Sequence, residues 1–457
     1  MIIKIQSNGS DARNDEEVGT VEARTGREKT AEDDEFFSDD RTTGVEGAVE
    51  LPGGDFRDFL LDPDDPTVAQ YRGESWDVYS AERTAPSFVQ ELLASWRRLY
   101  DEPFRGVTND GAVREGLYPL PVGAPGDPAL REAAERLLRT LDAEERERFT
   151  HPVDAPEWRA WSNPEFVIHR VGLRLEDLDE PEVRAVHDLL RASLSPEGYE
   201  RVRTLMSLNG FLGDLVGLPT VMNDRSYWVS MFGTPSDDAP WGWQLFGHHV
   251  AVNFLAVGDR HVIAPVFLGA EPAVTDDGRP GVFDEREAAA LRLAASLTDA
   301  QRERAVVYAS VLDPAMPEGR LHPADERHVA GAFRDNRVIP YEGIPAAELD
   351  AEQLGLLRAV VADFLLLLRE PQREATLRDY DAHLEETWFA WYGATDGTQP
   401  FYLRVQSPVI LAELDHHAGV WLGNRLPARF HVHTTLRLPN GNDYGRAYVD
   451  AWRARTA

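Results

Sequence analysis

Cysteine is absent from this chain of 457 residues, and lysine occurs only as Lys4 and Lys29. The lack of cysteine excludes disulfides, thiolate zinc sites, iron–sulfur clusters and cysteine nucleophiles. Any metal ion must therefore be held by histidine, aspartate or glutamate. The chain is also strongly acidic, with a formal net charge of -32. Nucleic acid and anionic membrane surfaces require a basic footprint, so we expect neither as a partner.

Targeting and membrane signals are missing as well. The N-terminal sequence MIIKIQSNGS lacks the basic region and apolar core of a secretory signal. No apolar run approaches the roughly 18 residues of a membrane-spanning helix. The segment VVADFLLLL, residues 360–368, reaches only about half of that length. We therefore expect a soluble, cytoplasmic protein.

The chain changes character twice along its length. Residues 1–52 are acidic and polar, and we expect a disordered tail there. Between residues 53 and 220, apolar residues recur at spacings of three and four, which predicts helices, two of them split at SPEG. From residue 221 onward, short runs rich in Val, Phe and Ile predict strands separated by further helices. This order predicts a single α+β domain over residues 53–457, with the helical region packed on a mostly antiparallel sheet.

Six of the 13 histidines form three pairs, His248–His249, His416–His417 and His431–His433, and all three fall on predicted strands. Side chains alternate between the two faces of a strand. In FHVHTTLRL, one face is apolar and the other carries His431, His433, Thr435 and Arg437. Histidines at alternate positions of one strand can chelate one metal ion. The sequence therefore predicts a metal site on the sheet.

The strand VILAELDHH is expected to complete this site. Alternation places Glu413, Asp415 and His417 on one face. If this strand pairs with the strand that carries His431 and His433, one of those three groups joins the metal site. Two histidines with a carboxylate or a third histidine suit non-haem iron, zinc or manganese.

The pair in GHHVAVNFL offers one further ligand. His249 shares the more polar face with Asn253, whereas His248 shares the apolar face. We favour His249 as the ligand, and a bulge at Gly247 would select His248 instead.

Aromatic and polar residues near these strands are candidates for substrate binding. Trp241, Trp243, Trp388 and Trp391, with Asn253, fit either an apolar substrate pocket or the core. Arg437 either neutralises a substrate carboxylate or pairs with an acidic side chain. Tyr444 either acts as an acid or hydrogen-bond donor in the site or packs in the interior.

Several stretches resemble a known family. They are GLRLEDL, LSPEGYERV, PWGWQLFGHH, PVFLGAEP, TWFAWYG and HVHTTLRLPNGNDYG. Over roughly residues 85–450 the chain resembles the bacterial and fungal family DUF3500, a domain of unknown function. The resemblance implies that the helical and strand-rich parts form one unit and that the histidine-bearing stretches belong together. It implies neither a metal nor a reaction.

These features lead to one main hypothesis and two alternatives. The main hypothesis is a metal-dependent enzyme that acts on a small organic molecule, with iron or copper and oxidative chemistry favoured. The first alternative is a zinc-type hydrolase or lyase, in which the metal activates water and Glu413 or Asp415 is the general base. The second is a non-catalytic protein that binds a small ligand. The sequence does not give the oligomeric state.

Overall fold

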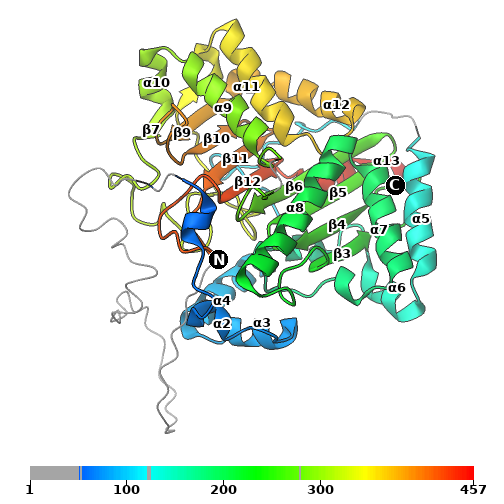
Figure 1. The fold of residues 1–457 in the computed structure, drawn as a ribbon. Coiled ribbons are helices and arrows are strands. Elements are labelled where there is room, and N and C mark those ends of the chain that lie inside the picture. Colours follow the sequence, from blue (N-terminus) through cyan, green and yellow to red (C-terminus); the bar gives the residue numbers. More distant parts are fainter. Residues whose placement is uncertain (1–50, 52–53, 121–124, 277–278) are drawn as a thin grey trace, which may run out of the picture.

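A computed structural model describes residue 51 and residues 54–120, 125–276 and 279–457 of the chain (Figure 1). The expected acidic tail, residues 1–52, lies outside the described residues apart from Leu51. Within the described ranges the protein has twelve α-helices and a twelve-stranded mixed sheet, most of it antiparallel. The fold is therefore α+β, as the sequence predicts.

Seven helices precede the long strands. They are α2 (Pro66–Ala69), α3 (Trp76–Thr84), α4 (Ser87–Asp101), α5 (Pro128–Thr140), α6 (Ala143–Phe149), α7 (Glu180–Ser193) and α8 (Pro196–Val216). The expected break at SPEG separates α7 from α8, because the Ser195 side chain accepts the Gly198 N–H and starts α8. Residues 127–149 contain two helices, α5 and α6, because Asp142 and Glu145 form a capping box that starts α6.

The sheet consists of two antiparallel meanders joined edge to edge. The first contains β3 (Tyr227–Phe232), β4 (Trp241–Gly247), β5 (Val250–Val257) and β6 (Arg260–Ala270). The second contains β9 (Trp388–Tyr392), β10 (Tyr402–Gln406), β11 (Leu411–His416) and β12 (Val432–Arg437). The join is the antiparallel pair β6–β12, which places Gly269 opposite His433. Strands that are far apart in sequence thus become neighbours at the join.

Short strands extend both edges of the sheet. They are β1 (Thr150–His151) and β2 (Leu173–Arg174), which pair with β3, and β7 (Val306–Tyr308) and β8 (Ile344–Pro345), which pair with β9. Every residue of β3, β4 and β5 is buried. Both faces of this half of the sheet are therefore covered, and Figure 1 shows α7 and α8 over one of them.

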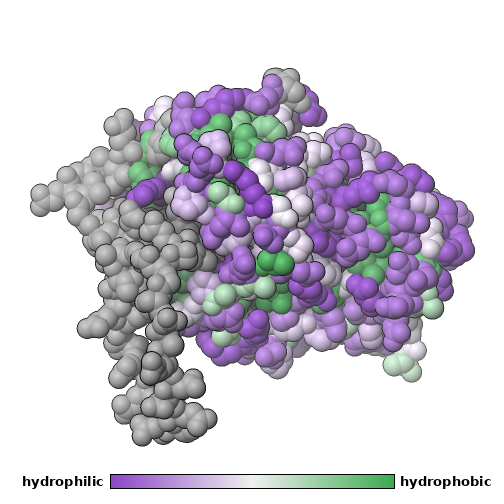
Figure 2. All heavy atoms as spheres, turned by 60° about the horizontal axis from the view of Figure 1, so that its bottom comes forward, coloured by the Kyte–Doolittle hydropathy of each residue, from purple (hydrophilic) through white to green (hydrophobic). Residues whose placement is uncertain are grey.

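The remaining helices are α9 (Asp284–Ser296), α10 (Asp299–Ala305), α11 (Ala351–Phe364), α12 (Glu370–Asp381) and α13 (Arg446–Thr456). Helix α11 ends inside the apolar segment 360–368. Among the described helices, none combines the length and apolar character that crossing a membrane requires. Hydrophilic side chains cover most of the face shown in Figure 2, and hydrophobic residues there form small separate areas.

The expected placement of one histidine pair is wrong, and His417 and His431 each lie one residue outside the strand expected to carry them. His248 and His249 do not lie on a strand, because they form the two-residue turn between β4 and β5. His249 adopts a φ of 65°, a left-handed conformation in which histidine is enriched among residues other than glycine. The alternation argument therefore does not apply to this pair.

Candidate metal centre

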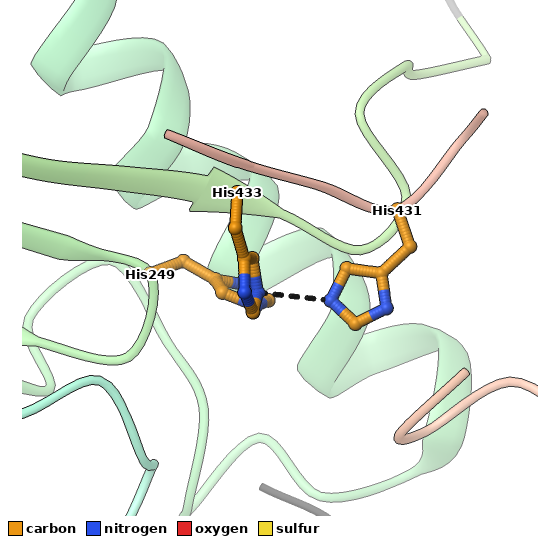
Figure 3. Close-up of side chains that lie close together, drawn as sticks. All are labelled: His249, His431 and His433. Carbon is orange, nitrogen blue, oxygen red and sulfur yellow. Dashed lines mark hydrogen bonds between the residues drawn. The ribbon is translucent and has the colours of Figure 1, made fainter. Parts of the chain in front are cut away.

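Three buried histidines meet where the two meanders join. His249 comes from the β4–β5 turn, His433 lies on β12, and His431 immediately precedes β12 (Figure 3). Strand β6 ties them together, because the Gly269 N–H donates to the His249 carbonyl at 2.7 Å and Gly269 pairs with His433. Within the part of the chain that the structure describes, this is the one group of three or more metal-ligating side chains whose ligand atoms all lie within 4.8 Å of one another.

The geometry of this triad fits a metal ion. The Nε2 atoms of His431 and His433 face each other at 3.1 Å (Figure 3). Two nitrogens that each lie about 2.1 Å from one ion are roughly 3.0–3.4 Å apart at angles of about 90–109°. The observed separation falls in that interval. The buried Nε2 of His249 has no hydrogen-bond partner among the described residues.

A hydrogen bond to the backbone orients His431, and a glycine leaves space for the other two rings. The Nδ1 of His431 lies 2.8 Å from the Ala418 carbonyl, to which it can donate its proton. This arrangement fixes the tautomer and leaves the Nε2 lone pair for a metal ion. Gly269 leaves room for the rings, because a Cβ at this position would lie 2.7 Å from His433 Cδ2 and 3.0 Å from His249 Cδ2.

The three imidazoles are held in the neutral form. Burial lowers the pKa of His249, His431 and His433 well below the usual value, and nearby histidines reinforce the shift. Neutral imidazole is the form that binds a metal ion. The structure therefore contains a buried triad that could hold one.

Two further expected ligands lie beside the triad. The His248 ring stacks on His249 at 3.8 Å, and its Nδ1 lies 2.8 Å from Asn209 Oδ1. Burial lowers the pKa of His248 to about 4, and the nearby Glu165 carboxylate opposes the shift. The His417 ring is 3.9 Å from His433, and its Nε2 is 3.1 Å from Asp415 Oδ2.

The hairpin expected between the strands of Glu413 and His433 is present, with Asp415 opposite His433 and Glu413 opposite Thr435. Both oxygens of Glu413 already accept backbone N–H groups, from Val329 and Ala330, and one also accepts the Tyr402 hydroxyl. Asp415 accepts the Arg327 N–H and Nε–H and contacts His417. Asp415 thus reaches the histidines through His417, whereas Glu413 anchors the neighbouring loop.

Arg437 and Tyr444 belong to a separate buried network. The Arg437 guanidinium donates to the carbonyls of Ala330 and Gly331 and to the carboxylates of Asp335 and Asp443. The Tyr444 hydroxyl donates to Asp335 and accepts the Trp161 Nε1–H. These contacts account for both side chains without a substrate.

The expected aromatic pocket is not assembled around the triad. Trp241, Trp243 and Trp391 donate their indole N–H to Ser236, Ser193 and Ala394, and Trp388 stacks on Tyr341. Asn253 bonds Gln244 and the Pro265 carbonyl. Instead, Phe267 contacts His433 at a ring separation of 5.1 Å.

Sequence reasoning missed several neighbours of the triad. Glu326, Arg327 and His328 come from the loop between β7 and β8, and His328 Nδ1 lies 3.1 Å from Thr435 Oγ1. His328 stands alone in sequence, so pair counting did not identify it. Its 6.2 Å ring contact with His433 depends on the long-range fold.

Glu271 is the other missed group. It follows β6, and its Oε1 accepts the backbone N–H groups of Val420, Trp421 and Leu422. Its Oε2 lies 3.8 Å from His431 Nδ1 and has no hydrogen-bond partner within the described ranges. Burial raises the pKa of Glu271 to about 7, although the three N–H donors oppose the shift. In the sequence, the only signal at this position is that Glu271 lies in GAEP, part of a stretch that resembles the DUF3500 family.

Comparison with known proteins gives a family without a described activity. No curated protein and no solved structure matches the chain. Residues 126–446 match the family model described as a protein of unknown function, DUF3500. The match covers β3–β6 and β9–β12, and so all three histidines of the triad. The chain belongs to the DUF3500 family.

Proposed function

We propose that this protein is a metal-dependent enzyme that acts on a small organic molecule and binds a divalent metal ion through His249, His431 and His433. The observation that carries the proposal is the pair of facing Nε2 atoms 3.1 Å apart. Two such nitrogens without an ion between them share at most one hydrogen bond, whereas an ion satisfies both. Buried polar atoms in proteins are normally satisfied.

The ligand set indicates what kind of ion fits. Three imidazoles and no thiolate suit iron, copper, zinc or nickel. Three protein ligands leave coordination positions for water or substrate, which is the arrangement of a catalytic rather than a structural site. We favour iron or copper, which would supply oxidative chemistry when bound. The chain itself contributes neutral ligands, the apolar wall of Phe267 and a fixed orientation for His431.

A specific contact favours the alternative, a zinc-type hydrolase or lyase. His417 lies against His433 and contacts Asp415, which Arg327 holds in place. A histidine oriented by a buried carboxylate is a suitable general base or acid. In this alternative His417 would move a proton next to the metal ion, and Asp415 would orient its ring.

Metal analysis tests the proposal directly. Protein purified without a histidine tag would be reconstituted separately with Fe(II), Cu(II), Mn(II) and Zn(II), and its bound metal measured. We expect about one tightly bound ion per chain, in keeping with one closed ligand group. His431→Ala and His433→Ala should lose it, and His187→Ala should retain it. His187 is a suitable control because it is partly buried near Tyr199, outside the triad.

The outcomes separate the hypotheses. Tight binding of iron or copper with metal-dependent oxygen consumption supports oxidative chemistry, whereas selective zinc binding supports the hydrolase or lyase. Metal that stays far below one equivalent with every ion would contradict a metalloenzyme and leave a small-ligand-binding protein.

A further inference from the structure

A second set of unsatisfied polar groups lies next to the triad. Each is at most 4% exposed, and each has one polar atom without a hydrogen-bond partner in the described part of the chain. We call this set the polar shell: Glu165 (Oε2), His248 (Nε2), Glu271 (Oε2) and Trp421 (Nε1). Native proteins leave few such atoms unsatisfied, so four in one place require an explanation.

Contacts connect the polar shell to the triad on both sides. The backbone N–H of Trp421 donates to Glu271 Oε1, and Glu271 Oε2 lies 3.8 Å from His431 Nδ1. On the other side, His248 stacks on His249, which contacts His431 at a ring separation of 5.5 Å. Glu271, Trp421 and His248 therefore border the triad rather than being scattered through the core.

Glu165 lies at one end of this arrangement. Its Oε1 accepts the Tyr79 hydroxyl and contacts Arg83, and the rings of Tyr79 and Trp421 are 6.2 Å apart. The chain of contacts thus runs from Glu165 through Tyr79, Trp421, Glu271, His431 and His249 to His248.

Glu271 is the least compensated member. Glu165 has Arg83 beside it, whereas among the described residues Glu271 has only backbone N–H donors on Oε1 and the His431 ring near Oε2. The His431 Nδ1 proton is already directed to the Ala418 carbonyl. Buried carboxylates are normally paired with a cation. The free oxygen of Glu271 therefore calls for a positively charged ligand group.

A second metal ion does not meet this need. Ligand atoms about 2.1 Å from one ion are at most about 4.2 Å apart. Among the described residues, Glu165, His248 and Glu271 do not form a group whose ligand atoms all lie within 4.8 Å. An ammonium group needs no such closed ligand set, because each of its protons can make a separate hydrogen bond of about 2.8 Å.

We propose that the substrate of this site carries a primary ammonium group, which Glu271 binds through Oε2 beside the metal triad. The indole N–H of Trp421 donates to an oxygen next to the amine, such as a hydroxyl or carbonyl. The substrate class is therefore primary amines with a neighbouring oxygen, including amino alcohols and amino-acid derivatives. That the ligand is a substrate rests on the proposed metalloenzyme, but the amine site itself is independent of the metal.

Three matched probes test the charge requirement. Ethanolamine, ethylene glycol and glycolate share one hydroxymethyl end and differ in the other end, which is cationic, neutral or anionic. Isothermal titration near neutral pH would be performed on metal-free and on metal-loaded protein. We expect ethanolamine to bind at least about tenfold more tightly than ethylene glycol, because a charge-assisted hydrogen bond replaces a neutral one.

Glu271→Gln should remove this preference. Glutamine keeps an oxygen that can accept the three backbone N–H groups, so the loop that contains Trp421 retains its anchor. Glu287→Gln is the matched control. Glu287 is also a buried carboxylate near a histidine, 3.3 Å from His416 Nε2, but it lies outside the polar shell. Its ethanolamine affinity should equal that of the wild type. Thermal unfolding of both variants would show that each is folded.

Each outcome has one meaning. Loss of the ethanolamine preference in Glu271→Gln alone supports the proposal. Equal binding of the three probes, or unchanged ethanolamine binding in Glu271→Gln, overturns it. If the metal-free protein keeps the preference but no metal ion binds, the amine site stands and the metalloenzyme proposal fails.

Discussion

The two ends of strand β12 carry buried polar side chains of opposite kinds. At its start, His431 and His433 direct nitrogen atoms at each other and share one contact. At its end, the Arg437 guanidinium has four protein acceptors at 2.6–2.8 Å. All three side chains are at most 3% exposed. Burial alone therefore does not distinguish a functional group from a structural one.

The difference lies in whether the fold itself satisfies the group. Although burial opposes it, Asp443 and Asp335 raise the pKa of Arg437. The network at this end is complete, and it holds the loop of residues 330–335 against the sheet. At the histidine end, the buried Nε2 of His249 has no hydrogen-bond partner among the described residues, and we propose that a bound ion completes it. We therefore expect mutations at the two ends to separate stability from ligand binding.

Arg437→Met should have the largest effect on stability. It leaves Asp443, whose pKa burial already raises to about 6, without its cation, and it also removes one partner of Asp335. Breaking a buried ion pair in this way costs about 3–5 kcal/mol. Urea unfolding would measure the loss, and metal bound per folded chain should stay unchanged.

The control is Arg136→Met, because the Arg136 side chain is 53% exposed. Surface substitutions of this kind change stability by about 0.5 kcal/mol or less. A loss at Arg437 no larger than at Arg136 would mean that the network does not stabilise the fold.

His261 is a buried histidine outside the triad, and it tests whether burial alone is enough for a histidine to bind a metal ion. It is 3% exposed, its Nδ1 has no partner among the described residues, and burial lowers its pKa from 6.5 to about 4. In the unfolded chain, His261 binds a proton below pH 6.5. In the folded chain, it binds one only below about pH 4. Stability is therefore full above pH 6.5 and falls as the pH drops toward 4. At pH 5 the expected loss from this residue is about 2 kcal/mol.

His261→Gln should reduce the difference in unfolding free energy between pH 7 and pH 5 by about that amount. Metal content should not change, because His261 lies outside the triad. Metal loss in this variant would show that the triad is not the binding site.

Gly269→Ala should weaken the metal site while the fold remains. The added Cβ would collide with the rings of both His433 and His249. Displaced ligands typically lower metal affinity at least about tenfold. Competition with a chelator would measure the affinity. Gly355→Ala on α11 is the control, because its Cβ would meet nothing within 4 Å and alanine favours a helix.

An affinity that is the same in Gly269→Ala and Gly355→Ala would contradict the placement of the metal ion between these rings.

The histidine end of β12 could be predicted in part from the sequence. The pairing of β11 with β12 depends on local pattern, and it is confirmed. Strand alternation favours His249 as a ligand, but the structure brings it to the triad from a turn, to which alternation does not apply. That turn requires a positive φ at His249, and its two residues, His248 and His249, are neither the glycine nor the asparagine that usually signals one.

The arginine end could not be predicted for a different reason. The partners Ala330, Gly331 and Asp335 are 102–107 residues away in the sequence from Arg437. Glu271 and His328 are likewise brought in by loops whose path the tertiary contacts decide. Periodicity shows which face a side chain is on, but it does not show whether a distant loop will satisfy that side chain.

Tyr444→Phe has the smallest expected effect on stability. The sequence leaves open whether Tyr444 belongs to the histidine site or packs in the interior, so this variant tests to which end of β12 the residue belongs. The change removes the hydroxyl that donates to Asp335 at 2.9 Å and leaves the Trp161 N–H without its acceptor. Asp335 keeps Arg159 and Arg437, so the loss should be about 1 kcal/mol. Urea unfolding would measure it, and metal affinity should equal that of the wild type.

The reverse pattern is expected for His433→Ala, which should lose the metal ion while the metal-free protein keeps most of its stability. If Tyr444→Phe instead lowered metal affinity about tenfold in a protein of unchanged stability, Tyr444 would belong to the histidine end. The two ends of β12 would then form one continuous site, and the completeness of the Arg437 network would not mark a boundary between structure and function.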